Sequence, residues 1–411
     1  MTANSVKFDP FSSAFRRDPY PLYRELRDRD PVHWSYINVW VLVRYEDIKA
    51  VLRDRRFAVV PVPQSLQEKS RYLEKKQRNL NAIVNISRHF LFYLEPPAWT
   101  RLHDFVAPAF GMAALEQWRD RIGQIVEELL NRVEDVQSFD LVSVLARPLP
   151  VAVISEILGI PRQDGEQLNE WADELARVLE PLLSLSEYEH LNQLVVEFSA
   201  YLQELLDRKR SHPEDDLMSA LATATRGDDR LSDEEIISLS MLLFATGEET
   251  TVNLVGNGTL ALLQQEGSLN GLQNRPDGMN AVVEELLRYD SPVQLGARLA
   301  LKDVEIGGKT IAAGQKLLLC LGGANRDPAV FEDPDRLNFN RFPNRHLAFG
   351  DGVHYCLGSG LARLQGRVAL ETIARKWPGL RLAGEPERRG RMVLRGLKSL
   401  PVTAGRSPAM L

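Results

Sequence analysis

The chain has 411 residues, 44% of them hydrophobic and 26% charged, an ordinary globular balance that excludes wholesale disorder. Its 50 basic and 56 acidic residues give a net charge of −6, which argues against a nucleic-acid partner, because proteins that bind nucleic acids usually carry a basic surface. The two cysteines, Cys320 and Cys356, are too few for a disulfide framework or a Cys-rich zinc site, so we expect a reducing compartment.

The sequence also gives no sign of export or membrane insertion. The first nine residues lack a basic cap followed by an apolar stretch, so no secretory signal is expected. The best uncharged apolar run, residues 236–246, is about half of the ~20 residues that span a bilayer. We therefore expect a cytoplasmic protein without a membrane anchor, and a monomer.

Short helices and strands are expected to alternate in the first sixty residues. Helices are predicted over residues 21–29 and 45–52, and a strand pair over 32–34 and 40–43 around Asn38. Helical periodicity dominates from about residue 97 to 265. Apolar side chains recur at 3.6-residue spacing over 115–133, 168–179 and 191–206, which predicts three amphipathic helices.

A capping box opens the next predicted helix. Ser232 can accept from the first-turn amides while Glu235 reaches back to the Ser232 amide. The helix is expected to run to about Gln265, roughly 50 Å at 1.5 Å per residue, so it should cross a whole domain and be central to it.

After Arg288 the predicted elements become mixed again. Residues 304–311 form a predicted hairpin with a Gly-Gly turn, 316–321 a strand, 357–376 a last helix and 392–402 a final hairpin. No linker, repeat or biased tract marks a boundary. The sequence thus predicts a mainly α fold with small β-sheets (α+β), formed by one large domain over residues 1–411.

The segment before the last helix carries the most informative chemistry. Cys356 lies just before the helix and follows a loop with two glycines, and a thiolate there would feel the positive helix end and nearby amides, which lower its pKa. Glycines also allow a flat ligand to approach closely. A lone cysteine is more often buried and inert, and this remains the interpretation for Cys320. A zinc site at His354 and Cys356 is disfavoured because no other cysteine is near.

Residues 349–358 read F-G-x-G-x-H-x-C-x-G, which resembles the haem-binding loop of the cytochrome P-450 superfamily in its soluble bacterial form. The resemblance covers about residues 9–403. It implies haem b (iron protoporphyrin IX) bound between a long central helix and the cysteine-loop helix, with Cys356 as the axial iron ligand. The remaining positions of the loop that it assigns to haem binding are Phe349, Gly350, His354 and Gly358.

Two further segments match the family in the expected order. Glu285 and Arg288 resemble its E-x-x-R pair, and at i, i+3 they share a helix face; the resemblance adds a later arginine, which is either Arg336 or Arg341. Residues 245–251 resemble A-G-x-[D/E]-T-T, with Thr246 where Ala or Gly is usual. By this resemblance Thr250 assists oxygen activation with its hydroxyl and Glu249 relays protons.

The resemblance also assigns haem propionate donors and pocket walls. His354 and Arg298 match propionate ligands, while Trp99 and His103 stand where the family usually has His and Arg. The alternative for Trp99 is simple packing on the haem edge. The predicted substrate-pocket residues are Phe244, Thr246, Val293, Gln294, Leu295 and Leu397.

The implied activity is that of a haem-thiolate monooxygenase that inserts one atom of O₂ into an apolar or amphiphilic small molecule, in secondary metabolism or xenobiotic oxidation. No reductase domain follows the final hairpin, so NAD(P)H-derived electrons are expected from a ferredoxin or flavodoxin with its reductase. Candidate docking charges for that partner are Arg101, Arg345, Arg363 and Arg367. Oxidative coupling, nitration or desaturation on the same fold, and a non-catalytic haem-thiolate sensor, are alternatives.

The segment 68–88 carries six basic and two acidic side chains, a net charge of +4. It could recognise an acidic substrate or an acidic carrier protein that delivers a tethered one. A solvated helix face is the plainer interpretation.

Overall fold

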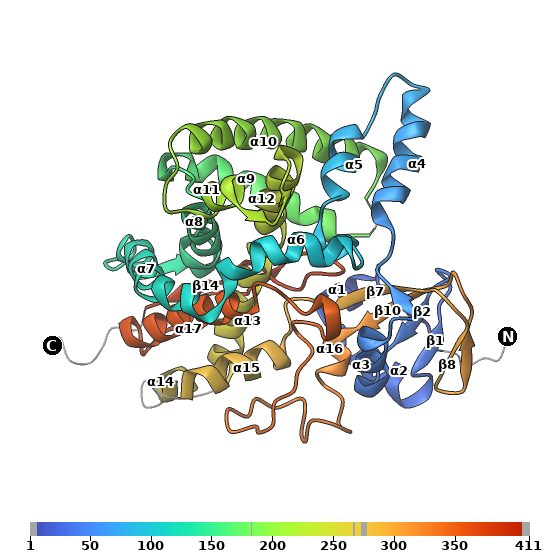
Figure 1. Cartoon of the computed structure of the whole chain (residues 1–411). Helices are drawn as coiled ribbons and strands as arrows, with labels where there is room; N and C mark the ends of the chain where they lie inside the picture. Colours follow the sequence, from blue (N-terminus) through green and yellow to red (C-terminus); the bar gives the residue numbers. More distant parts are fainter. Residues whose placement is uncertain (1–5, 182, 266–267, 273–277, 405–411) are drawn as a thin grey trace. The chain divides into compact units, whose positions relative to one another are not determined.

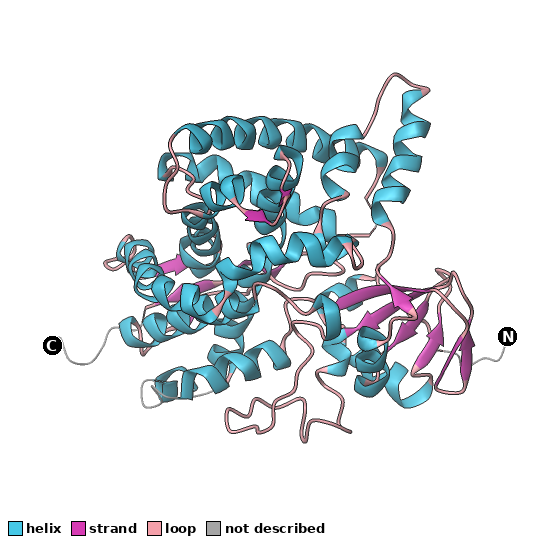
Figure 2. Ribbon diagram, in the orientation of Figure 1, coloured by secondary structure: helices cyan, strands magenta, loops and turns pink. Residues whose placement is uncertain are grey.

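The computed structural model describes residues 6–181, 183–265, 268–272 and 278–404. They are mainly helical with small separate sheets, which confirms the predicted fold class (Figure 2). The chain forms two compact units, residues 1–60, 126–146 and 250–411 (unit 1) and residues 61–125 and 147–249 (unit 2). A single domain over residues 1–411 stays a prediction.

Unit 2 is built from helices and one small hairpin in its described part (Figure 1). Its elements are α4 (Val62–Glu74), α5 (Asn81–Ser87), α6 (Ala98–Val106), α7 (Met112–Asn131, which continues into unit 1), α8 (Pro148–Ile157), α9 (Gly165–Leu175), α10 (Leu185–Ser211), α11 (Leu217–Thr223), β5 (Thr225–Arg226), β6 (Asp229–Arg230) and α12 (Asp233–Gly247).

Aromatic side chains join three of these helices in the core of unit 2. The Phe198 ring of α10 lies edge-on to Phe244 of α12 at 5.3 Å between centroids, and Trp171 of α9 lies 4.8 Å from Phe198. An edge-on pair such as Phe198 and Phe244 contributes about 1 kcal/mol beyond the free energy gained by burying its apolar area. The apolar stripes predicted over 168–179 and 191–206 are the faces that meet here.

Unit 1 combines several sheets with the remaining helices. Its helices are α1 (Ser13–Arg17), α2 (Tyr20–Arg29), α3 (Tyr45–Arg53), α13 (Glu249–Gln264, whose first residue belongs to unit 2), α14 (Ser268–Leu272), α15 (Met279–Tyr289), α16 (Leu321–Ala324) and α17 (Ser359–Lys376). Its strands are β1 (Val32–Trp34), β2 (Trp40–Leu42), β3 (Phe57–Ala58), β4 (Ser138–Asp140), β7 (Leu295–Ala300), β8 (Val304–Ile306), β9 (Lys309–Ile311), β10 (Lys316–Cys320), β11 (Arg381–Leu382), β12 (Glu387–Arg388), β13 (Leu397–Ser399) and β14 (Pro401–Thr403).

A five-stranded sheet organises one side of unit 1, with strand order β1-β2-β10-β7-β3. The hairpin β1–β2 turns at Asn38, whose φ of 58° fits the predicted turn. Strand β10 pairs parallel to β2 and antiparallel to β7, with Leu317 opposite both Trp40 and Arg298. The register therefore fixes Arg298 in the interior of the sheet.

Two predicted elements differ from the structure. The single helix expected over 232–265 is interrupted at Glu248 (φ −80°, ψ −74°) between α12 and α13, although the capping box at Ser232 forms as expected. Just before the interruption, the hydroxyl of Thr246 donates to the Leu242 carbonyl at 2.8 Å, a bond that competes with the helix ladder.

The final hairpin predicted over 392–402 is wrong in its pairing. Strands β13 and β14 occupy that region, but β13 pairs with β12 and β14 pairs with β11 and β4. The alternation of apolar residues marks strands but carries no information on which distant strand is the partner. The other predicted helices and the hairpin of 304–311 are present, with ends shifted by a few residues.

Candidate active site

The loop that leads into α17 is held by its own backbone. The Gly350 amide donates to the Leu347 carbonyl at 2.9 Å, and the Cys356 amide donates to the Phe349 carbonyl at 3.0 Å. Gly350 and Gly352 have φ values of 72° and 73°, a left-handed conformation that glycine adopts without strain. These bonds place Cys356 three residues before α17, which begins at Ser359 rather than at the predicted residue 357.

Close packing on α3 adds a second reason for glycine at position 352. A Cβ at Gly352 would lie 2.5 Å from the Leu52 carbonyl oxygen at the end of α3. A larger residue would push the loop away from this helix. The loop is therefore anchored on a helix from the start of the chain.

The environment of the Cys356 thiol differs from the expectation in one respect. The residue as a whole is exposed, yet desolvation by the surrounding protein raises the pKa of its thiol. The Gly358 amide and the Arg363 charge lower this pKa in part, but the protein alone does not bring it below its usual value. The predicted lowering by the helix end and amides is thus outweighed by desolvation.

A buried ion cluster in unit 1 is centred on Glu285 of α15. Arg288 donates from Nε and Nη2 to the two carboxylate oxygens of Glu285 at 2.8 and 2.7 Å, and neither side chain has any exposed surface. Arg341 completes the group, with Nε 3.1 Å from Glu285 Oε2, whereas Arg336 contributes its backbone carbonyl to Arg288. The third arginine that the sequence left open is therefore Arg341.

The predicted propionate donors fall into two sets. Arg298 on β7 and His354 in the loop are both half-buried and belong to unit 1 with Cys356. Trp99 and His103 belong to α6 of unit 2, where their rings stack at 4.3 Å and 21° between planes. The i, i+4 spacing on one helix face explains that stacking.

The residues of unit 1 fit an iron porphyrin. Cys356 is exposed, and a Cβ at Gly358 would meet no atom within 4 Å, so the backbone two residues after the cysteine borders open space. Arg298 and His354 could satisfy the carboxylates of such a group. Among the described residues no cluster of three or more His, Cys, Asp or Glu side chains offers an alternative metal site.

Comparison with known proteins identifies the family. A family profile described as Cytochrome P450 matches residues 32–274 and 264–378. The chain belongs to the cytochrome P-450 family. It is a P-450 monooxygenase with a haem iron cofactor, and no helix of its described residues has the length and apolarity to cross a membrane.

Several relatives align over nearly their whole length. The polyketide biosynthesis P-450 PksS and the biotin biosynthesis P-450 of Bacillus subtilis are 36% and 38% identical, over 97% and 95% of this chain and 98% of each relative. The vitamin D(3) 25-hydroxylase of Pseudonocardia autotrophica is 36% identical over 98% of both chains. The structure of the P-450 BioI with acyl carrier protein ligated to hexadec-9Z-enoic acid superposes with a TM-score of 0.89 at 36% identity, covering 96% of this chain and 100% of that one.

In this P-450 the segment predicted to activate oxygen, residues 245–251, lies at the helix interruption. Glu249 and its neighbour Glu248 are each 1% exposed, and Thr250 is half-buried at the start of α13. Phe244 is fully buried against Phe198 in the core of unit 2, and its place in a pocket wall stays a prediction.

Four other predicted wall residues of the P-450, Val293, Gln294, Leu295 and Leu397, belong to unit 1, whereas Thr246 belongs to α12 in unit 2. The Gln294 amide donates to the Val393 carbonyl at 2.8 Å, and Val293 forms a bridge with Leu394. Leu397 is buried over Gly256 of α13. Residues 293–294, which follow α15, and residues 393–394 near the end of the chain are therefore paired side by side.

Of the four predicted docking charges, Arg101 is committed elsewhere. It binds Asp229 at 2.7 Å and also pairs with Glu235, which ties α6 to the β5–β6 hairpin and the start of α12. Arg363 pairs with Glu284 at 2.6 Å. Arg345 is exposed, while Arg367 lies mostly inside the protein.

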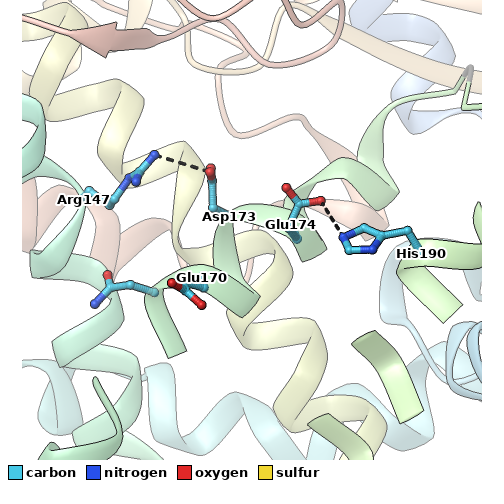
Figure 3. Close-up of a pocket in the computed structure, with 6 residues that line it drawn as sticks. Arg147, Glu170, Asp173, Glu174 and His190 are labelled. Carbon is cyan, nitrogen blue, oxygen red and sulfur yellow. Dashed lines mark hydrogen bonds and ion pairs between the residues drawn. The ribbon is translucent and has the colours of Figure 1, made fainter. Parts of the chain in front are cut away.

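A polar hollow on the surface of unit 2, of about 510 Å³, contains none of the predicted site residues. Figure 3 shows Arg147 paired with Asp173 and Glu174 paired with His190 around it. All six residues that line it are polar or charged, which is unlike a pocket for an apolar substrate.

Proposed function

We propose that the protein inserts one atom of O₂ into a C–H bond of an apolar or amphiphilic small molecule. The balance is substrate C–H plus O₂, two electrons and two protons to C–OH and water. The observation that supports this best is the exposed Cys356 in a glycine loop, with open space at Gly358 two residues later. When bound, a thiolate-ligated haem supplies the electron density that favours O–O cleavage.

The chain's own residues would supply protons and hold the cofactor. Arg298 and His354 of unit 1 are proposed to hold the propionates. The two protons are proposed to pass from the Glu249 carboxyl to the Thr250 hydroxyl, since a carboxyl next to a hydroxyl in a dry site can form a proton wire. The apolar side chains of Val293, Leu295 and Leu397 are proposed to exclude water from the substrate.

Isotope labelling tests the reaction directly. The holoenzyme, a surrogate ferredoxin and its reductase, and NADPH would be incubated with ¹⁸O₂ and a panel of fatty acids and steroids. We expect one ¹⁸O atom in the product of at least one panel member that also shifts the haem spin state. Products without ¹⁸O, or dimeric or desaturated products only, would reject monooxygenation.

A separate protein is proposed to deliver the electrons, and a carrier protein to deliver the substrate. Exposed basic side chains are concentrated at the end of α4, where Arg71, Lys75 and Lys76 are close in sequence to Tyr72, which is 51% exposed. Lys76 lies 5.2 Å from the centre of the Tyr72 ring. This basic end of α4 suits an acidic partner, and the relative BioI was solved with an acyl carrier protein.

The carrier proposal can be tested apart from the chemistry. Arg71→Glu/Lys75→Glu should weaken binding of hexadecenoyl acyl carrier protein at least tenfold and leave binding of free hexadecenoic acid unchanged. Arg132→Glu, an exposed charge on another segment, serves as the control. Equal affinity of both variants for the loaded carrier would contradict this use of α4.

A further inference from the structure

A buried ion cluster in unit 1 lies at the point where α15 ends. Asp290, the C-cap residue of α15, accepts from Nε of Arg395 at 2.6 Å and from the hydroxyl of Tyr20 at 2.8 Å. Arg388 reaches its other oxygen at 3.2 Å. Asp290 and Arg395 are each 8% exposed, so this pair is almost out of contact with water.

The cluster fixes two segments that are far apart in the sequence. The Arg395 amide donates to the Pro292 carbonyl at 2.8 Å, and its guanidinium reaches the Arg17 carbonyl at 2.9 Å. On the other side, Gln294 donates to the Tyr20 hydroxyl at 3.2 Å. Residues 292–294 and 393–397, which we call the strap, are therefore held to one another and to the first helices of the chain.

The strap lies directly on α13. The Arg395 carbonyl accepts from Asn257 at 2.8 Å, and Leu397 packs over Gly256. A Cβ on Gly396 would lie 1.6 Å from Oδ1 of Asn253, so the backbone at Gly396 touches that side chain. Asn253 has no exposed surface, and neither polar atom of its amide has a hydrogen-bond partner in the structure.

Helix geometry relates this contact to the proposed chemistry. Asn253 and Asn257 follow Thr250 by three and seven residues, so all three share one face of α13. At 1.5 Å per residue they lie roughly 4.5 and 10 Å further along the helix axis. The strap thus covers the helix face that continues from Thr250.

We propose that Asp290 and Arg395 are positioning residues that hold the strap against α13 and so fix the position of the substrate wall next to Thr250. This rests on the proposed function, because it takes Thr250 to mark the reaction site. Asp290 does not touch substrate in this account. It acts through Arg395, Gly396 and Leu397, and it leaves the iron ligand Cys356 unaffected.

Two nitrogen ligands of the haem iron distinguish an effect on the substrate wall from an effect on the iron itself. Imidazole occupies the iron position alone, whereas 4-phenylimidazole also fills space beside it. In Asp290→Asn we expect 4-phenylimidazole to bind about tenfold more weakly, with imidazole affinity changed less than twofold and the ferrous–CO spectrum unchanged. An equal change for both ligands, or none, would overturn the proposal.

A second pair of variants keeps the test valid if Asp290→Asn fails to fold. Gly396→Ala should weaken 4-phenylimidazole binding because its methyl meets Asn253, and adding Asn253→Ala should restore the affinity to within twofold. The proposal is contradicted if Asn253→Ala alone binds 4-phenylimidazole like the wild type but does not restore the affinity of Gly396→Ala. A wild-type enzyme with no thiolate–CO band would instead reject the proposed function.

Discussion

Asp290 stays ionised in a buried position because three arginines surround it. Burial alone would raise its pKa, but Arg395, Arg388 and Arg326 hold the pKa at about 2. Arg326 is itself held between Tyr20 and Tyr289, with its guanidinium carbon 3.6 and 4.2 Å from the two ring centres. Removing one member of such a cluster is costly, because the others keep a buried and uncompensated charge.

This residue gives a pH dependence of known sign. Its folded pKa of about 2 is below the ~3.9 of an unfolded Asp, so its contribution is complete above pH ~4 and is lost as the pH falls towards 2. From pH 6 to pH 3 the wild type should lose about 1 kcal/mol more unfolding free energy than Asp290→Asn. Urea unfolding at both pH values measures this, with Glu25→Gln in an exposed pair as control. Parallel pH curves would contradict the ionised, arginine-bound Asp290.

The Thr250 hydroxyl is the second residue whose role can be isolated. Thr250→Ala should leave NADPH consumption within a few-fold of wild type but reduce product per NADPH severalfold. Without the hydroxyl, proton delivery is no longer directed, so more of the reduced oxygen leaves as hydrogen peroxide. The measurement is the ratio of product and hydrogen peroxide to NADPH. Thr223→Ala removes a comparable hydroxyl from α11 and should keep the wild-type ratio. Unchanged coupling in Thr250→Ala would reject the proton-relay role.

At the scale of elements, local signals predicted local structure well. The capping box at Ser232, the turn at Asn38 and the Gly307-Gly308 hairpin each depend on a few adjacent residues, and each is present. The interruption at Glu248 was missed because helical periodicity is nearly the same for one helix and for two in line. The Thr246-Gly247 pair was the available signal.

Site residues were predictable only where a motif fixes spacing along the chain. Glu285 and Arg288 are i, i+3 neighbours and pair as expected. The choice of Arg341 over Arg336 depends on the path of an irregular segment, and the ion pairs of Arg101 depend on residues more than a hundred positions away. The Asp290 cluster was missed for the same reason.

The anchoring of the cysteine loop on α3 gives a prediction at this scale. Gly352→Ala combines a left-handed φ with a Cβ 2.5 Å from the Leu52 carbonyl, so it should cost about 2 kcal/mol or more and reduce haem content. Gly314→Ala has a φ of 84° but open space around its Cβ, so it measures the backbone cost alone. Thermal unfolding and haem per protein are compared. Equal losses in both variants would show that the α3 contact does not matter.

For the whole molecule, the net charge of −6 does not describe each surface. Arg345 is exposed next to the cysteine loop, and its neighbour Phe342 is 95% exposed. An acidic electron donor would be attracted to an exposed arginine beside an apolar side chain, and salt would weaken the encounter.

Charge reversal at this position tests that association. Arg345→Glu should slow reduction by an acidic ferredoxin severalfold at low ionic strength, with the difference shrinking as salt is added. Reduction by dithionite should be unaffected. Arg132→Glu changes the net charge equally and serves as control. Equal slowing by both reversals would attribute the effect to overall charge rather than to a docking surface.

The assignment of Cys356 as the iron ligand is tested most directly by the ferrous–CO difference spectrum of Cys356→Ser. The wild type should give the red-shifted Soret band of thiolate ligation. Cys356→Ser should lose this band completely, and Cys320→Ser, which changes a buried thiol in β10, should keep it. A thiolate band that persists in folded, haem-loaded Cys356→Ser would contradict the account.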